Sequence, residues 1–153
     1  MAPNPDGSKK RRNRQQMASL LDGLPTHLPS LTLASQITQR VSEVGFDWPN
    51  LRGLIAKLDE EMEELKKAIA SSDREDIQEE IGDLFFVLVN LARWVGIDPE
   101  RALKGTIRKF VSRFKYIERS VKKAGKSLVE SDLLEMEELW QEAKGRRFDR
   151  KRP

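Results

Sequence analysis

Two stretches of the sequence decide the fold: KLDEEMEEL at residues 57–65 and IQEEIGDLFFVLVNL at residues 77–91. In both, apolar residues recur every three or four positions, which is the spacing of one face of an α-helix. A short Ser-Ser-Asp turn at residues 71–73 is expected to join the two helices that carry these runs. The sequence therefore predicts two long helices that lie side by side in antiparallel directions.

Acidic residues fall on the apolar face of the first helix as well as on its solvent side. Glu61 lies in the same stripe as Leu58 and Leu65, so we expect it to face the core. Glu64 lies three residues further on and borders that stripe, whereas Glu60 points more outward. Acidic runs are usually solvated helix faces, but the helical phase of Glu61 and Glu64 argues against that interpretation here.

The second helix carries a similar acidic pair. Glu80 and Asp83 lie three residues apart, beside an apolar run over residues 84–89. A helix this apolar is expected to be central and largely buried. A buried carboxylate is costly unless it is paired or bound to a metal ion. For this helix alone, salt bridges to Lys or Arg on a neighbouring helix are the slightly simpler explanation.

The two helices together favour a metal site. Four carboxylates are expected to converge between them: Glu61, Glu64, Glu80 and Asp83. Without a counter-charge such a cluster repels itself and raises its own pKa values. A divalent cation removes the conflict, and oxygen ligands favour Mg²⁺ or Mn²⁺. The absence of Cys and the single His27 exclude thiolate sites and multi-histidine sites.

Further start and stop signals predict the remaining helices. We expect helix starts at Asn50, at a Ser72–Glu75 capping box, at Asp98 with Pro99, and at Ser131 or Asp132, and helix ends at Gly45, Gly96, Gly125 and Gly145. No segment alternates apolar and polar residues for long enough to predict a strand. The predicted fold is an all-α bundle of four to five helices, which is expected to associate into oligomers.

The net charge of +3 is unevenly distributed along the 153 residues. Basic residues crowd both ends, whereas the segment from Met17 to Gly145 has 18 basic and 23 acidic residues. The length suits one domain with its own core. We expect a disordered basic tail at 1–16, a linker at 17–30, a helical domain at 31–145 and a basic tail at 146–153.

The chain shows no sign of a membrane or export segment. Its N-terminal sequence is polar and lacks the apolar core of a signal peptide. The longest apolar run, Leu84 to Val89, is too short to span a bilayer. We therefore expect a soluble, cytoplasmic protein with no membrane partner.

The acidic motifs resemble the hallmark of the MazG family, within the all-α nucleoside triphosphate pyrophosphohydrolases. That hallmark is EExxE followed on the next helix by ExxD, and here EEMEE spans Glu60 to Glu64 and EIGD spans Glu80 to Asp83. Other blocks match in order: LPSL from Leu28, VGFDW from Val44, EEIGDLFFVLVNLAR from Glu79, KFVSRF from Lys109 and MEELWQEAK from Met136. EExxE alone has little specificity, whereas these blocks in order over residues 20–145 are specific.

The resemblance implies which residues contact metal and substrate. It assigns the metal to the four acids that helical phase selects. It assigns Lys109 and Arg113 to the triphosphate, and Trp140 and Lys144 to the nucleotide. Without the resemblance, Lys109 and Arg113 would be ordinary surface charges, and core packing would explain Trp140 equally well.

Three further residues lie near these motifs. Asn90 follows Asp83 by two helical turns, and we expect it to face the same pocket and contact the substrate. Phe46 and Trp48 belong to the VGFDW block, and we expect them to be packing residues. His27 falls in the linker and is given no chemical role.

The resemblance also implies the reaction, which is Mg²⁺-dependent hydrolysis of an NTP or dNTP to a nucleoside monophosphate and pyrophosphate. Metal ions would neutralise charge at the α-phosphorus and acidify a bound water. Glu60 or Glu64 would orient or deprotonate that water, and Glu61 belongs to the same catalytic group. Members of the family are typically dimeric or tetrameric, with the site near a subunit interface, so we expect at least a homodimer.

A different class of function fits the basic tails, namely a nucleic-acid-binding or protein-binding helical module without catalysis. It predicts salt-sensitive DNA or RNA binding that survives the loss of Glu61 and Asp83. It gives no reason for acids on apolar helix faces. A di-iron helical protein normally needs Glu-x-x-His pairs, and the single His27 argues against it. Hydrolysis is therefore the favoured interpretation.

Overall fold

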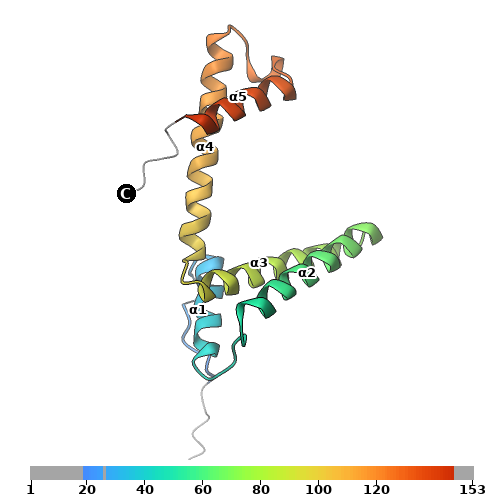
Figure 1. Ribbon diagram of the computed structural model, residues 1–153, viewed down its shortest axis with the longest axis vertical. Coiled ribbons are helices and arrows are strands. Elements are labelled where there is room, and N and C mark those ends of the chain that lie inside the picture. The colour runs from blue at the N-terminus through green and yellow to red at the C-terminus, as the bar shows by residue number, and fades with distance from the viewer. Residues whose placement is uncertain (1–18, 26, 147–153) are drawn as a thin grey trace, which may run out of the picture.

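The protein consists of helices over the residues that its computed structural model describes, 19–25 and 27–146 (Figure 1). The elements are α1 (Ser30–Ser42), α2 (Leu51–Ser71), α3 (Arg74–Trp94), α4 (Pro99–Lys123), the short 3-10 helix η1 (Leu128–Glu130) and α5 (Leu133–Gly145). These described residues contain no strand. The predicted all-α class, with five α-helices, is confirmed.

Three helices start at the capping side chains that the sequence predicts. Asn50 Oδ1 accepts a hydrogen bond of 2.9 Å from the Gly53 amide at the start of α2. Asp98 accepts one of 3.0 Å from a first-turn amide of α4, where Pro99 occupies the first helical position. Asp132 caps α5 in the same way at 2.8 Å. Each cap satisfies a backbone N–H that has no carbonyl partner inside the helix.

The predicted capping box of Ser72 and Glu75 at the start of α3 is wrong. Ser72 instead ends α2 in the left-handed conformation, with a φ of 58°. The Asp73 carboxylate caps α3 and accepts hydrogen bonds from the amides of Glu75 at 2.9 Å and Asp76 at 3.3 Å. A carboxylate can accept two amides, and its charge suits a helix N-terminus, so Asp73 takes the capping position.

The helices are arranged in two packed groups (Figure 1). α2 and α3 lie side by side as an antiparallel hairpin, and α1 packs against α3. α4 starts beside α1 and α3 and then runs away from them, and α5 folds back along the far part of α4. The predicted bundle is therefore open in a single chain, with α4 and α5 forming an arm.

The core is small and is divided between the two groups. Leu54 of α2 and Val89 of α3 are each 1% exposed. In the arm, Ile117 and Val121 of α4 and Ala143 of α5 are buried. The core residues Leu54 and Val89 help to hold α2 and α3 together, and this packing fixes the side chains between the two helices.

The expectation that α3 is largely buried is wrong for the single chain. Ile81, Phe85 and Leu88 are 42%, 56% and 46% exposed. Apolar residues surround this part of α3, but α1 and α2 cover only part of its circumference. With side chains of α2, these three line an apolar groove of about 410 Å³. Contiguous exposed apolar surface usually marks an interaction surface.

The predicted tails lie outside the described residues, apart from Arg146 at the edge of the C-terminal one. Part of the predicted linker, 19–25, is described and is attached to α1. Arg40 of α1 donates hydrogen bonds to the carbonyls of Leu20 at 3.2 Å and Asp22 at 3.0 Å. In the described part of the chain, no helix has the length and apolar character needed to cross a membrane.

Replacing Leu54 by Ala tests the core. We expect Leu54→Ala to lower the free energy of unfolding by about 2–5 kcal/mol, because the truncation leaves a cavity between α2 and α3. Leu134→Ala removes the same atoms from a side chain that is 70% exposed, and should change stability by less than about 0.5 kcal/mol. Urea unfolding followed by circular dichroism measures both. Equal losses would contradict the placement of Leu54 in the core.

Candidate metal and nucleotide site

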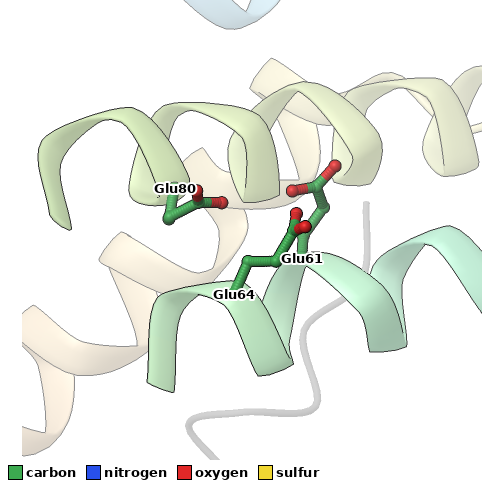
Figure 2. Close-up of side chains that lie close together, drawn as sticks. All are labelled: Glu61, Glu64 and Glu80. Atoms are coloured by element: carbon green, nitrogen blue, oxygen red, sulfur yellow. The ribbon is translucent and has the colours of Figure 1, made fainter. Parts of the chain in front are cut away.

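Three carboxylates meet between α2 and α3. Glu61 and Glu64 of α2 and Glu80 of α3 direct their side chains into the space between the two helices (Figure 2). One oxygen from each lies within 4.8 Å of the others. These are three of the four acids that helical phase selects, and the short turn between the helices brings them together.

Glu61 is the buried member of the cluster, with 4% of its surface exposed. Lys57, one turn earlier on α2, places Nζ 2.7 Å from Glu61 Oε1 and 2.9 Å from Glu60 Oε1. The hydrogen bond to Glu61, followed by that to Glu60, raises the pKa of Lys57 above its usual value, so the ammonium stays charged. This ammonium offsets only part of the negative charge of the cluster.

Glu80 is strongly affected by its neighbours. Burial raises its pKa, and the charges of Glu64, Glu61 and Asp83 raise it further, in that order. Glu80 Oε2 is buried and accepts no hydrogen bond from the described part of the chain. A buried acceptor without a donor is unfavourable unless a positive group takes that place. Because the donors are all carboxylate oxygens, the cluster fits a hard divalent cation.

Asp83 lies beside the cluster, one turn after Glu80 on α3. It is exposed, and it lines a cavity together with Glu61. Its charge is close enough to contribute to the raised pKa of Glu80. The three-oxygen group does not include it, so its role as a metal ligand stays a prediction.

A cavity of about 530 Å³ opens next to Glu61 and Asp83. α1, the segment before α2, α2 itself and α3 contribute to its walls, and much of the lining is apolar: Ile37, Val41, Phe46, Trp48, Phe86 and Val87. Its volume lies within the roughly 300–1,000 Å³ that is usual for small-molecule sites. An apolar cavity that borders a carboxylate cluster suits a ligand with one flat, weakly polar end and one metal-binding end.

The two aromatic residues of the VGFDW block behave differently. Trp48 is half-buried and packs over Gly53, where a Cβ would lie 3.4 Å from the indole ring. Phe46 is 79% exposed, so its expected role as a packing residue is wrong for the single chain. Phe46 follows α1 at a position that none of the described helices covers, and it lines the cavity instead.

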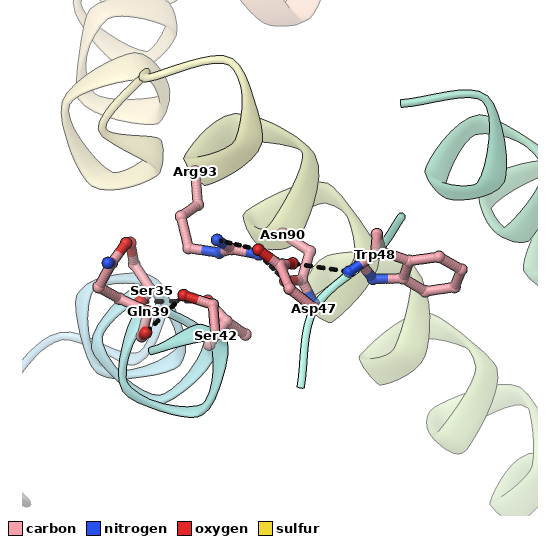
Figure 3. A network of polar contacts seen from close by, with 8 residues as sticks. Ser35, Gln39, Ser42, Asp47, Trp48, Asn90 and Arg93 are labelled. Atoms are coloured by element: carbon pink, nitrogen blue, oxygen red, sulfur yellow. Dashed lines mark hydrogen bonds and ion pairs between the residues drawn. The ribbon is translucent and has the colours of Figure 1, made fainter. Parts of the chain in front are cut away.

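A polar network joins the cavity wall to the end of α3 (Figure 3). Arg93 Nη1 donates to Asp47 Oδ2 at 3.1 Å, and Arg93 Nη2 donates to Asp47 Oδ1. Nη2 also donates to Asn90 Oδ1 at 3.3 Å. The hydrogen bond from Arg93 lowers the pKa of Asp47 below its usual value. Asp47 and Asn90 both line the cavity, so the predicted position of Asn90 near Asp83 agrees with the structure.

The predicted substrate contacts on α4 and α5 lie on the arm (Figure 1). Arg113 stacks over the ring of Trp140 at 5.4 Å, and the rings of Phe110 and Trp140 are 5.3 Å apart. Lys109 and Lys144 are exposed on the same two helices. The structure therefore brings Arg113 and Trp140 together, but on the arm that extends away from the carboxylate cluster.

Three polar residues of the site have no role in the sequence analysis: Lys57, Asp47 and Arg93. Lys57 lies four residues before Glu61, which is a favourable spacing for an ion pair on a helix, so this contact was predictable. Asp47 and Arg93 are separated by 46 residues. No local pattern links them, and only the packing of α1 and α3 brings the two segments together.

The charge on Asp47 can be tested through the pH dependence of stability. Since folding lowers its pKa from the usual 3.8, the ionised carboxylate stabilises the protein above that pH, and the contribution is lost as the pH falls below it. We expect Asp47→Asn to cost about 1 kcal/mol at neutral pH and much less near the acid limit. Urea unfolding over a pH series measures this. A cost that stays constant with pH would contradict the ion pair.

Comparison with known proteins supports the resemblance to the MazG family. Residues 50–117 match the MazG nucleotide pyrophosphohydrolase domain. This segment contains α2, α3 and most of α4, and with them the carboxylate cluster, Lys109 and Arg113.

The chain is also similar to three named proteins over most of its length. It is 39% identical over 137 residues to the nucleoside triphosphate pyrophosphohydrolase/pyrophosphatase MazG of Thermotoga maritima, covering 90% of this chain and 52% of that protein. It is 40% identical over 146 residues to the nucleoside triphosphate pyrophosphohydrolase of Escherichia coli K12, covering 92% and 55%. It is 39% identical over 137 residues to the uncharacterized protein YabN of Bacillus subtilis, covering 89% and 28%.

The chain thus spans about half the length of the first two relatives. The domain match includes both acidic motifs, and the similarity to these relatives extends beyond it to most of the chain. Over residues 50–117, the chain carries a MazG nucleotide pyrophosphohydrolase domain.

Proposed function

We propose that this chain hydrolyses nucleoside triphosphates, ribo- or deoxyribo-, to a nucleoside monophosphate and pyrophosphate, with Mg²⁺ or Mn²⁺ as cofactor. The cluster of Glu61, Glu64 and Glu80 carries the proposal, because its buried acceptor oxygen and mutual repulsion call for a cation. The domain match and the names of two relatives support the substrate class.

Glu61, Glu64 and Glu80 would hold the cation, and Asp83 would complete the set from the cavity side. A divalent ion in this position supplies positive charge at the α-phosphorus and acidifies a water molecule. Lys57 restrains Glu61 through Oε1, which leaves Oε2 of the same carboxylate available inside the site.

Two acids are candidates for the group that orients or deprotonates the attacking water. Glu60 is paired with Lys57, and its side chain is 56% exposed. Glu64 lies within the carboxylate cluster. This difference favours Glu64 as the group that orients or deprotonates the water, and Glu60 as the group that holds Lys57 in place.

The triphosphate also needs positive partners, and Lys57, a cation that lines the cavity, is already paired with Glu60 and Glu61. Lys109, Arg113 and Lys144 would hold its oxygens, and Trp140 would contact the nucleotide. In a single chain these residues lie on the α4–α5 arm, away from the cluster. We infer that they approach the cluster from another copy, in a homodimer or tetramer.

Exposed apolar surface supports this association. Phe85 of α3 and Phe110 of α4 are 56% and 57% exposed, and Ile107 of α4 is 51% exposed. Burying such side chains between copies is favourable by about 25 cal/mol for each Å² of apolar surface removed from water. An oligomer would thus cover the apolar groove on α3 and also bring the cationic residues of a second copy to the carboxylate cluster.

The oligomeric state is tested by size exclusion with light scattering. We expect a mass of twice the chain mass of 17.6 kDa or a higher multiple. Phe85→Glu should shift the protein toward the monomer, because a charge on the exposed face of α3 would be buried in the interface. A monomeric mass for the wild-type protein at micromolar concentration contradicts the association.

The reaction is tested with a panel of NTPs and dNTPs in the presence of Mg²⁺, with the products resolved by ion-exchange chromatography. Attack at the α-phosphorus yields the monophosphate and pyrophosphate. Attack at the γ-phosphorus yields the diphosphate and phosphate instead. Release of the diphosphate and phosphate, or no cleavage of any nucleotide in the panel, would contradict the proposal.

Neutralising single carboxylates distinguishes a metal site from a set of structural ion pairs. We expect Glu61→Gln and Asp83→Asn to reduce turnover at least about 100-fold while folding as well as the wild type, because each relieves repulsion. Glu63→Gln is the matched control, since Glu63 lies in the same motif but is 62% exposed and pairs with Lys66. Unfolding of both test variants would favour structural salt bridges.

The alternative function as a nucleic-acid-binding module depends on the basic tails, which fall almost wholly outside the described residues. Salt-sensitive DNA or RNA binding that survives Glu61→Gln would support it. The acidic cluster supports hydrolysis instead.

A further inference from the structure

Most polar side chains at the wall of the cavity already have partners within the chain. Thr38 donates its hydroxyl to a backbone carbonyl of α1 at 3.1 Å, and Lys57 is held by two carboxylates. Asp47 accepts two hydrogen bonds from Arg93 and one of 2.8 Å from the Trp48 backbone amide. Asn90 is a neutral side chain at this wall whose hydrogen-bonding groups are only partly used.

The partner of Asn90 fixes the orientation of its amide. A guanidinium can only donate hydrogen bonds, so the Asn90 atom at 3.3 Å from Arg93 Nη2 has to be the oxygen. Arg93 is itself held by both oxygens of Asp47 (Figure 3). Within the described residues the Asn90 amide nitrogen makes no hydrogen bond. The side chain therefore offers both N–H donors to a ligand in the cavity, while Arg93 takes one of the two lone pairs of its oxygen.

The position of Asn90 suits the base of a nucleotide. It lies seven residues after Asp83 on the same helix, which corresponds to about 10 Å along the axis. That separation leaves room for the sugar between the carboxylates and Asn90. The cavity walls between them include Phe86 and Val87, which suit the faces of a flat ring.

From this geometry we propose that Asn90 reads the base as a hydrogen-bond donor, and that Arg93 and Asp47 are positioning residues that fix its orientation. The site then favours bases with a carbonyl at the pairing edge, such as uracil, thymine, guanine or hypoxanthine. It disfavours cytosine and adenine, which carry an amino group at the equivalent position and would oppose donor to donor. This inference rests on the proposed function, because it takes the cavity ligand to be the nucleotide.

The test compares two ligands that differ at C4, a carbonyl in uracil and an amino group in cytosine, and in the proton at the adjoining N3. The α,β-imido analogues of dUTP and dCTP carry the same sugar and triphosphate, and isothermal titration calorimetry with Mg²⁺ gives the affinity for each. We expect the wild-type protein to bind the dUTP analogue about tenfold more tightly, the effect of roughly one mismatched hydrogen bond. Because the two ligands have equal charge, their affinity ratio cancels any general electrostatic effect.

Asn90→Asp changes the donor into an acceptor of the same size. We expect the ratio of affinities to fall to one or to reverse in favour of the dCTP analogue, with an unchanged circular dichroism spectrum. Gln36→Glu is the matched control, because it adds the same charge at an exposed position of α1 outside this cavity. The control should retain the wild-type ratio. A wild-type ratio in Asn90→Asp would overturn the role of Asn90.

Variants at Asp47 test the positioning role. Asp47→Asn releases Arg93 and should reduce the ratio toward one, whereas Asp47→Glu retains the carboxylate and should preserve the preference. If Asp47→Asn fails to fold, the ratio in Asp47→Glu still decides, because a loss of preference there shows that the carboxylate does not act through Arg93. A purely structural role would lower both affinities together and leave the ratio unchanged.

The measurement separates this inference from the proposed function, because an imido bridge blocks cleavage between the α- and β-phosphates. A ratio near one, together with release of pyrophosphate from dUTP, overturns the base preference alone. The expected ratio without any pyrophosphate release overturns the hydrolase alone. Failure of both analogues to bind overturns both.

Discussion

Repulsion among Glu61, Glu64 and Glu80 is the constraint on which the rest of the structure depends. The three groups meet because α2 and α3 pack tightly, and that packing is provided by side chains such as Leu54 and Val89. The apolar contacts therefore hold together charges that would otherwise separate. Lys57 relieves only part of the repulsion, and Glu80 Oε2 has no hydrogen-bond donor among residues 19–25 and 27–146. Folding in this way holds three carboxylates close together, at the place where we propose that a cation binds.

The molecule keeps its negative and its positive functional groups apart. The acids lie on the hairpin, and the cationic and aromatic groups predicted for substrate contact lie on the arm formed by α4 and α5. Within one chain this separation keeps Lys109 and Arg113 from pairing with the carboxylates. The exposed apolar faces on both parts give a physical reason for two copies to meet.

Local chemistry made much of the fold predictable. The caps at Asn50, Asp98 and Asp132 follow from residue type, and the burial of Glu61 follows from its helical phase. The exposure of α3 was not predictable, because periodicity shows which surface is apolar and not what covers it. The contact between Asp47 and Arg93 depends on how α1 places the segment before α2, and no spacing in the sequence encodes that placement. Identifying α4 and α5 as a separate arm likewise required the tertiary structure.

The tight turn between α2 and α3 has a consequence for how this chain tolerates changes in length. Each residue of an α-helix advances the side-chain direction by about 100°. Since Asp73 fixes where α3 begins, one residue added or removed between it and Glu80 would rotate Glu80 out of the space shared with α2. The segment that separates the two acidic motifs can therefore accept many substitutions, while insertions and deletions there would break the site without unfolding the hairpin.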